Sequence, residues 1–288
     1  MTRTVQVQCP AKINLFLEIT GKKKNGYHTL ASLFAKVGVF DVIDAEITEG
    51  RDFDFEIKNE TDQTLKAGPD NLVCKAAAAF RKKFDVGVGV RIVLTKRIPM
   101  GAGLGGGSSD AAGTLIALAR LFHMRLDRKL SAALKKMALE LGADVPFFIR
   151  GGIQHGSGIG EVLEPVEMDF RDPVLLVIPP VQVSTKQAFE GLRLELTDQW
   201  APVTFRRLLT KADVTQLFEN HFEPSVFHTY PQISKIKADL FDRDAWFASL
   251  SGSGSTVYGV FEDRKLAEAA QSFFQRQGNT AVLTEPVG

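Results

Sequence analysis

Cysteine is almost absent from this sequence. The 288 residues include only two, Cys9 and Cys74, which excludes a disulfide framework and a structural zinc site with several cysteine ligands. The fold must therefore be held together by its hydrophobic core. A chain of this length can do so, since it buries about three quarters of the surface that its unfolded form exposes.

The sequence also lacks an excess of charge of either sign. It has 35 basic and 34 acidic residues, a formal net charge of +1, whereas proteins that coat nucleic acids or attach to membranes through basic patches carry a surplus. No run approaches the roughly 18 apolar residues of a membrane-spanning helix, and residues 1–10 lack the apolar core of a secretion signal. We expect a cytoplasmic protein without a nucleic-acid or membrane partner.

The apolar periodicity predicts strands and helices in alternation. In the first half we expect strands over 5–19, 37–49, 53–57 and 88–94, and helices over 71–83, 111–122 and 130–141. In the second half we expect strands over 174–178, 256–261 and 281–284, and helices over 204–209, 232–240 and 264–277. The pattern changes near residue 169, where we place a domain boundary.

Two local signals refine the first elements. Residues 9–12 (Cys-Pro-Ala-Lys) interrupt the apolar run of 5–19, which predicts two strand pieces on either side of a loop. Asp70 or Asn71 stands where the helix of 71–83 would begin, as a capping residue does.

The end of the helix over 130–141 has its own signals. Gly142 follows it, and we expect this glycine to close the helix in the left-handed conformation. Pro146 should then keep the connection 143–146 from continuing as a helix.

Glycine is concentrated in one short segment. Residues 101–107 contain five glycines, between the strand of 88–94 and the apolar stretch of 111–122. Without side chains, backbone N–H groups can approach a ligand closely, and the first turn of a helix adds unpaired donors and the positive end of its dipole. Ser108 and Ser109 add hydroxyl groups. The pattern is typical of a phosphate-binding loop.

Known phosphate-binding loops differ from this one. The Walker loop needs Gly-Lys-Ser/Thr before its helix, where this sequence has Gly-Ser-Ser. Gly101, Gly103 and Gly106 fit the dinucleotide pattern, with Asp127 about twenty residues on, but that pattern follows a buried parallel strand and 88–94 alternates in polarity. The glycine loop of protein kinases joins two strands. An ATP site on another fold is favoured, with a dinucleotide oxidoreductase as a distant alternative.

Three separated segments resemble the signature motifs of the GHMP family of small-molecule kinases. They are residues 10–15 (Pro-Ala-Lys-Ile-Asn-Leu), 99–109 (Pro-Met-Gly-Ala-Gly-Leu-Gly-Gly-Gly-Ser-Ser) and 250–256 (Leu-Ser-Gly-Ser-Gly-Ser-Thr). Residues 25–28 (Asn-Gly-Tyr-His) and 141–146 (Leu-Gly-Ala-Asp-Val-Pro) are similar to members that act on a cytidine-diphosphate-linked sugar alcohol in the non-mevalonate isoprenoid pathway. The resemblance covers nearly the whole chain.

This resemblance implies a fold and a division of the chain. The expected fold is α/β (α+β), the two-domain GHMP kinase fold. Its N-terminal domain is similar to domain 2 of ribosomal protein S5, and its C-terminal domain is a ferredoxin-like α+β domain. We expect residues 1–168 to form the N-terminal, ATP-binding domain and 169–288 to form the C-terminal domain.

The resemblance also implies a reaction, transfer of the γ-phosphoryl group of ATP to a tertiary hydroxyl of the acceptor. Asp144 matches the family's catalytic aspartate and would take the hydroxyl proton. Lys12 matches the lysine beside it, where a cation would keep the carboxylate ionised and stabilise developing negative charge. Mg²⁺ is expected with ATP, and no residue is assigned as its ligand.

Binding residues are implied for both substrates. The phosphates of ATP would lie along the glycine-rich segment, formed by Pro99, Met100, Gly101, Ala102, Gly103, Leu104, Gly105, Gly106, Gly107, Ser108 and Ser109, with Asn71 near the nucleotide. The acceptor would contact Asn14, Tyr27, His28, Thr185 and Phe189. Of these, Tyr27 and Phe189 would enclose the cytosine ring, and His28 would read its edge.

Each motif has a structural alternative, and the function has rivals. Asn71 and Asp144 suit helix starts or turns, Phe189 suits core packing, and 251–256 suits a tight turn between a helix and a strand. A GHMP kinase of the homoserine or mevalonate type, or a catalytically silent nucleotide-binding module, remain alternatives. We expect a monomer or a weak homodimer.

Overall fold

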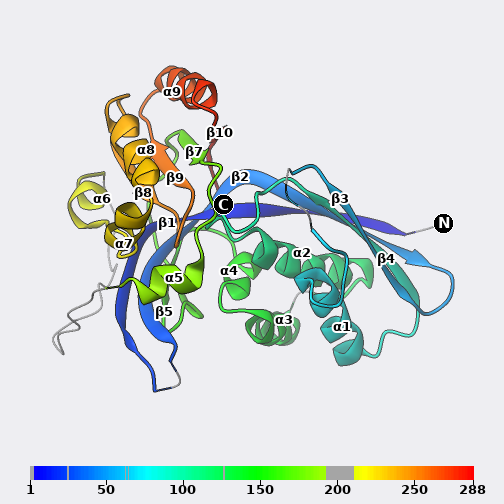
Figure 1. Ribbon diagram of the computed structural model, residues 1–288. Helices are drawn as coiled ribbons and strands as arrows, with labels where there is room; N and C mark the ends of the chain where they lie inside the picture. The colour runs from blue at the N-terminus through cyan, green and yellow to red at the C-terminus, as the bar shows by residue number, and fades with distance from the viewer. Residues whose placement is uncertain (1–2, 25, 62, 64, 126, 193–210) are drawn as a thin grey trace. The chain divides into compact units, whose positions relative to one another are not determined.

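The computed structural model describes residues 3–24, 26–61, 63, 65–125, 127–192 and 211–288. The chain divides into two compact units. Unit 1 comprises Met1–Ala11, Val39–Met100 and Gly105–Gly151, and unit 2 comprises Lys12–Gly38, Gly101–Leu104 and Gly152–Gly288. Two long strands, β1 (Thr4–Lys22) and β2 (His28–Thr48), contribute residues to both units and are the long blue strands of Figure 1.

Unit 1 combines a sheet with four helices. Strand β3 (Phe53–Asn59) runs parallel to β4 (Gly89–Lys96), which pairs antiparallel with the C-terminal part of β2 from Val42↔Thr95 to Thr48↔Gly89. The helices are α1 (Leu72–Phe84), α2 (Gly106–Leu121), α3 (Arg128–Leu141) and α4 (Val145–Ile149). Helix α2 is buried along most of its length because its small residues let other elements approach.

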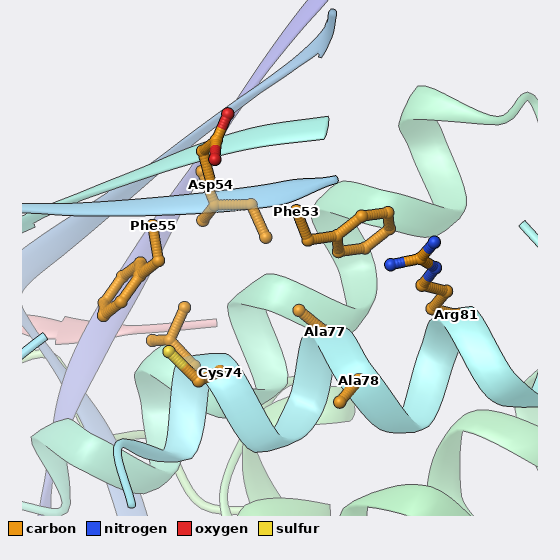
Figure 2. Close-up of a pocket in the computed structure, with 9 residues that line it drawn as sticks. Phe53, Asp54, Phe55, Cys74, Ala77, Ala78 and Arg81 are labelled. Atoms are coloured by element: carbon orange, nitrogen blue, oxygen red, sulfur yellow. The ribbon is translucent and has the colours of Figure 1, made fainter. Parts of the chain in front are cut away.

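A cavity of about 210 Å³ lies between β3 and α1. Figure 2 shows Phe53 and Phe55 pointing from the strand toward Cys74 and Ala77 of the helix, with Asp54 on the opposite side. The alternation of 53 and 55 on one face agrees with the sequence pattern. The small side chains of α1 leave this space incompletely filled.

Unit 2 contains a sheet with the order β10-β7-β9-β8 in the described residues. Its strands are β7 (Val174–Ile178), β8 (Phe247–Leu250), β9 (Val257–Val260) and β10 (Thr280–Thr284), all paired antiparallel. Helix α8 (Pro231–Phe241) precedes β8, and α9 (Arg264–Arg276) lies between β9 and β10. This β-α-β-β-α-β order, with the fourth strand beside the first, is the ferredoxin-like arrangement, and it confirms that prediction.

Shorter elements complete unit 2. Strand β5 (Gln154–Ser157) pairs with the N-terminal part of β2 and with β6 (Val162–Pro165), and β11 (Pro286–Val287) also pairs with β2. Helices α5 (Thr185–Glu190), α6 (Lys211–Leu217) and α7 (Glu223–Thr229) lie between β7 and α8 in sequence. The core of this unit packs the inner faces of α8 and α9 against the sheet, through residues such as Ile233, Phe274 and Val177.

The predicted break in the first strand is wrong. Residues 4–22 form one uninterrupted strand that includes Pro10. The φ angle fixed by proline is compatible with an extended backbone, and a single missing N–H does not end a strand. The predicted helix over 204–209 lies outside the described residues.

Two predictions about the end of α3 are also wrong. Gly142 has a φ of 168°, which is extended rather than left-handed, and its N–H donates to the Ala138 carbonyl oxygen. The connection that follows leads directly into the short helix α4, with Pro146 in its first turn. Proline is tolerated there because the N–H it lacks would have no intrahelical partner.

None of the helices in the described part of the chain is long and apolar enough to cross a membrane.

Candidate active site

Lys12 and Asn14 lie side by side on β1 in unit 2. Both side chains are buried, and Lys12 Nζ donates to Asn14 Oδ1. The amide of Asn14 donates in turn to Ser32 Oγ on β2 at 2.8 Å, and that hydroxyl donates to the Phe16 carbonyl oxygen at 2.7 Å. The β-strand period of two places residues 12 and 14 on the same face. A buried ammonium group is therefore held by a fixed amide.

The first half of the glycine-rich segment lies against this strand. Lys12 N donates to the Leu104 carbonyl oxygen at 2.9 Å. Gly101 and Gly103 have φ angles of 66° and 78°, the left-handed region that favours glycine. A Cβ on Gly103 would lie 2.0 Å from the Ser251 carbonyl oxygen, so this position has no room for a side chain.

The turn over 251–256 contacts both features. Ser251 Oγ donates to the Gly103 carbonyl oxygen at 2.9 Å, and Thr256 N donates to the Ala102 carbonyl oxygen at 3.2 Å. A Cβ on Gly252 would lie 3.3 Å from Lys12 Nζ. The turn joins β8 to β9, and not a helix to a strand as the sequence alone suggested.

Helix α5 carries two of the predicted acceptor residues. Thr185 stands in its first turn, with Oγ1 3.0 Å from Ser253 Oγ in the turn. The ring of Phe189 stacks on His28, with centroids 4.8 Å apart and planes 12° apart. The Tyr27 side chain is 62% exposed. The structure thus brings His28 and Phe189 into contact and leaves Tyr27 at the surface.

His28 has an altered pKa. Burial lowers it, and the nearby charge of Lys22 lowers it further. The neutral imidazole is therefore favoured at pH 7, and a neutral imidazole has one donor and one acceptor nitrogen. Such a ring can pair with the edge of a nucleobase.

The second half of the glycine-rich segment begins α2 in unit 1. Gly105, with a φ of 68°, occupies the capping position and has no side chain with which to cap. The first-turn N–H groups of α2 are therefore left for a ligand or solvent, as at other anion sites. Ser109 Oγ is buried and has no hydrogen-bond partner among the described residues. A phosphate oxygen or a water would satisfy it.

The entrance to this segment is fixed by a residue that the sequence patterns missed. Gln63 Oε1 accepts from Met100 N at 2.6 Å, and Gln63 Nε2 donates to the Met100 carbonyl oxygen at 3.1 Å. The side-chain amide of Gln63 thus bonds both backbone groups of Met100, as a neighbouring strand would. No local sequence pattern predicts this contact, because residues 63 and 100 are far apart in sequence.

A buried charged cluster lies at the base of α2. Asp41, Lys96 and Asp110 are 0, 1 and 3% exposed. Lys96 Nζ contacts Asp41 Oδ2 and donates to Asp110 Oδ2 at 2.9 Å. Asp41 Oδ1 also accepts from the backbone N–H groups of Arg97 and Ile98, at 2.6 and 2.8 Å. The cluster ties the end of β4 to β2 and to the first turns of α2.

The charges in this cluster do not balance, since two carboxylates face one ammonium group. Burial raises the pKa of Asp110 to about 8; Lys96 opposes the rise and Asp41 adds to it. Burial alone would lower the pKa of Lys96, but the carboxylates of Asp110 and Asp41 outweigh it and raise that pKa. Lys96 and Asp110 stand on either side of the glycine-rich segment, but Asp41 is 55 residues from Lys96, so patterns around the loop did not reveal the cluster.

The remaining predicted residues of unit 1 stand at helix starts. Asn71 caps α1, its Oδ1 accepting from Val73 N at 2.9 Å. Asp144 precedes α4, and its side chain makes no capping bond there among the described residues. Asp144 belongs to unit 1 and Lys12 to unit 2, so their pairing stays a prediction.

The described residues contain no group of three or more His, Cys, Asp or Glu side chains that could hold a metal ion. A divalent ion that arrives on the phosphates of a nucleotide needs no such group, because phosphate oxygens and water supply most of its ligands.

Comparison with known proteins identifies the family. The model of the N-terminal domain of GHMP kinases matches residues 71–152, and the model of their C-terminal domain matches residues 202–280. The chain belongs to the GHMP kinase family. The first match contains the helix starts, the glycine-rich segment and Asp144. The second contains the turn over 251–256.

Individual relatives are similar over nearly the whole chain. The 4-diphosphocytidyl-2-C-methyl-D-erythritol kinase of Chlorobium phaeobacteroides (strain BS1) is 39% identical, over 98% of this chain and 97% of its own. The kinase of the same name from Thermoanaerobacter pseudethanolicus is 34% identical, over 93% and 91%. A crystal structure of 4-(cytidine 5'-diphospho)-2C-methyl-D-erythritol kinase has a TM-score of 0.81 and 30% identity, over 99% and 100%.

A more distant neighbour shares the fold. Homoserine kinase from Cytophaga hutchinsonii has a TM-score of 0.74 at 18% identity, over 99% of this chain and 95% of its own. The two-domain GHMP kinase fold predicted from the motifs is thus confirmed.

Proposed function

We propose that this protein is an ATP-dependent kinase that phosphorylates the 2-hydroxyl group of 4-diphosphocytidyl-2-C-methyl-D-erythritol, a step of the non-mevalonate route to isoprenoids. One observation carries the proposal. The backbone of Lys12 is bonded to Leu104 while its buried ammonium group lies beside Gly252. A fixed cation therefore stands where two glycine turns meet. Relatives at 34–40% identity over most of their length support the choice of acceptor.

The reaction is a direct transfer between oxygens. The bond from the γ-phosphorus to the bridging oxygen of ATP breaks, and a new bond forms to the oxygen at C2 of the acceptor. ADP leaves, and the hydroxyl proton passes to the carboxylate of Asp144. Lys12, whose ammonium group is held by Asn14, stabilises the negative charge that develops on the transferred group. Asn14 keeps this cation in place and contacts the sugar alcohol.

ATP binds along residues 99–109 in this proposal. Gly101, Gly103 and Gly105 have left-handed φ angles, and backbone N–H groups in such turns can form concave sites for phosphate oxygens. The uncapped start of α2 adds its dipole. Asn71 lies near the nucleotide through its place at the start of α1. Mg²⁺ enters with ATP as part of the substrate and neutralises the phosphates.

The cytidine end of the acceptor binds at the aromatic residues. In this proposal the rings of Tyr27 and Phe189 enclose cytosine, which displaces the His28 ring from the face of Phe189 that it covers in the structure. The neutral imidazole of His28 then reads the cytosine edge. Thr185, already positioned against Ser253, contacts the sugar alcohol or its phosphate. Base stacking on aromatic rings contributes about 1–3 kcal/mol per base.

We also propose that residues 1–168 and 169–288 serve as the ATP-binding and C-terminal domains of a cytoplasmic enzyme. In this proposal it acts as a monomer or a weak homodimer, with ATP and the cytidine-linked compound as its partners and without nucleic acid or membrane. The two family matches, at 71–152 and 202–280, fall on either side of the proposed boundary.

The test is phosphoryl transfer by the purified protein with MgATP. We expect ADP release and a new phosphate monoester in the ³¹P NMR spectrum with 4-diphosphocytidyl-2-C-methyl-D-erythritol. Reactions without acceptor measure plain hydrolysis, and reactions with homoserine or mevalonate test the related acceptors. Transfer to either of these in preference to the cytidine-linked compound would overturn the proposed acceptor. ATP binding without any transfer would indicate a silent nucleotide-binding module.

A further inference from the structure

Asn220 is a buried amide between α6 and α7 in unit 2, and it has no counterpart among the sequence motifs. Its side chain is 3% exposed. Asn220 Nδ2 donates to the carbonyl oxygens of Leu250 and Gly252, at 2.7 and 2.9 Å, and Oδ1 accepts from Phe222 N at 3.0 Å. The opposite amide orientation would set an oxygen against two carbonyls and an NH₂ against an N–H. The hydrogen bonds therefore fix the orientation.

These bonds hold the start of the turn over 251–256. Leu250 is the last residue of β8, and its N–H donates to Glu223 Oε1 at 2.9 Å. Both backbone groups of Leu250 are thus bonded to side chains at or just before α7. The second bond of Asn220 reaches Gly252, which has a left-handed φ of 57°. A buried polar group bonded in this way resists displacement, because breaking its bonds leaves unpaired donors.

Asn220 is itself anchored to the strand that carries Lys12. Leu17 N donates to the Glu219 carbonyl oxygen at 2.8 Å, and His221 N donates to the Leu17 carbonyl oxygen at 2.9 Å. These bonds form an isolated parallel bridge between Leu17 and Asn220. His221 Nδ1 also accepts from Ile19 N at 3.1 Å. The side chain of Asn220 therefore links β1 to the turn.

The turn that it holds is in contact with the candidate active site. Gly252 lies beside Lys12 Nζ, Ser251 bonds to Gly103, and Ser253 bonds to Thr185. A shift of this turn would change all three contacts together. A misplacement of about 1 Å at such a site can lower the rate about 10²-fold.

We infer that Asn220 is a positioning residue for the reaction: through Leu250 and Gly252 it fixes the second glycine turn against Lys12 and the phosphate-binding segment. The inference rests on the proposed function for its effect on catalysis. Asn220 does not touch substrate, because the three bonds described above direct its amide to the backbone of this chain.

The test compares two variants with matched controls. Asn220→Ser is too short to reach Leu250 or Gly252. Asn220→Asp keeps the acceptor for Phe222 N and sets an oxygen against both carbonyls. The controls are Asn279→Ser and Asn279→Asp, because Asn279 Nδ2 also donates to a backbone carbonyl oxygen in unit 2, that of Phe274 at 3.4 Å. If Asn220→Asp does not fold, the comparison of Asn220→Ser with Asn279→Ser decides the test.

Four measurements are made on each protein: kcat with both substrates, the affinity for CDP, the melting temperature, and amide hydrogen exchange of peptides that cover 249–257 and α9. For the Asn220 variants we expect faster exchange in 249–257 but not in α9. We also expect kcat to be at least about tenfold lower, with unchanged affinity for CDP. The Asn279 variants should match the wild type in kcat and in the exchange of 249–257.

Two results would overturn the inference. One is wild-type exchange of 249–257 in both Asn220 variants. The other is a parallel loss of kcat, CDP affinity and melting temperature, which indicates general destabilisation. A wild-type protein that does not phosphorylate the cytidine-linked acceptor would contradict the proposed function instead, and the exchange comparison would still decide whether Asn220 holds the turn.

Discussion

His28 stacks on Phe189, with ring centroids 4.8 Å apart and planes 12° apart. The pair joins the start of β2 to helix α5, and Phe189 also contacts Phe222 edge-on at 4.8 Å. One face of Phe189 is thus covered by an imidazole whose pKa is lowered by burial and by Lys22. In the proposed reaction this is where cytosine binds.

Tyr27 and Phe189 should contribute to the binding of the cytidine nucleotide and not to the binding of the adenine nucleotide. We expect Tyr27→Ala or Phe189→Ala to weaken CDP binding about 5- to 150-fold, the equivalent of about 1–3 kcal/mol of stacking, with little change for ADP. Calorimetric titration of each variant with both nucleotides measures this. Phe241→Ala, at an exposed phenylalanine of α8, is the control. Equal weakening of CDP and ADP would reject the stacking assignment.

Asp144 should matter for turnover and not for nucleotide binding. Asp144→Asn removes the proton acceptor, so we expect kcat to fall at least about a hundredfold, as for other positioned bases, with a similar KM for ATP. Asp127→Asn is the matched control, because Asp127 also stands at a helix start, where it accepts from Leu130 N at 2.8 Å, and Asn caps equally well. Near-normal turnover of Asp144→Asn would remove it as the base.

Asp110 should make the stability of the protein depend on pH. Its pKa is raised from 3.8 to about 8, so the folded state holds a proton that the unfolded state releases at lower pH. The stability that this proton contributes is present below pH 3.8, declines as pH rises toward 8, and is lost above it.

Asp110→Asn cannot titrate, so its melting temperature should exceed that of the wild type by a margin that grows from pH 5 to pH 9. About 1 kcal/mol shifts the melting temperature of a chain this size by roughly 2–4 °C, so a change of several degrees is expected. Asp239→Asn, which removes a surface partner of Lys235 on α8, is the control. Parallel melting curves of Asp110→Asn and wild type across this range would contradict the prediction.

Gly101 and Gly103 have similar backbone angles but should differ sharply in how much melting temperature and kcat are lost when each is replaced by alanine. Gly101→Ala and Gly103→Ala both place a Cβ at a left-handed φ, which costs about 1–2 kcal/mol. At Gly101 nothing lies within 4 Å of that atom, whereas at Gly103 it would lie 2.0 Å from the Ser251 carbonyl oxygen. We expect Gly103→Ala to lose considerably more melting temperature and kcat. Equal effects of the two substitutions would show that the close approach is unimportant.

The cavity beside α1 can be tested with neighbouring alanines. Ala77→Leu fills space that is lined by Phe53 and Phe55, and we expect a gain of about 0.5–2 kcal/mol in the free energy of unfolding, as for other cavity-filling changes. Ala76 is fully buried and does not line the cavity, so Ala76→Leu should lose about 1–3 kcal/mol by overpacking. Urea denaturation measures both. A loss at both positions would mean that the cavity cannot accept the side chain.

Features with local signals could be predicted from the sequence. The cap of α1 at Asn71, the glycine-rich start of α2 and the strand Val174–Ile178 all follow from neighbouring residues, and the structure confirms them. The left-handed close at Gly142 was wrong because Gly142 is extended, and a short turn through Asp144 leads from it into α4.

The candidate site was only partly predictable for a related reason. Lys12 and Asn14 follow from a motif, but Asn220, Gln63 and Lys96 each have a hydrogen-bond or ion-pair partner that lies 30 or more residues away. The spacing of apolar residues does not predict polar contacts between residues that are far apart in sequence. Asp110 illustrates the difference, because it directly follows the glycine-rich segment in sequence, and only the fold shows that it is bonded to Lys96 inside unit 1.

The bridge between Leu17 and Asn220 has a consequence for how this chain can be cut. The ferredoxin-like sheet belongs to a unit that includes residues 12–38 and 101–104. A fragment that starts after residue 104 would contain the strands of this sheet but not the part of β1 that belongs to the same unit. Leu17, Ile19 and their bonds to residues 219–221 would be missing. A fusion of this C-terminal fragment to another protein should therefore be insoluble unless the fusion also includes β1.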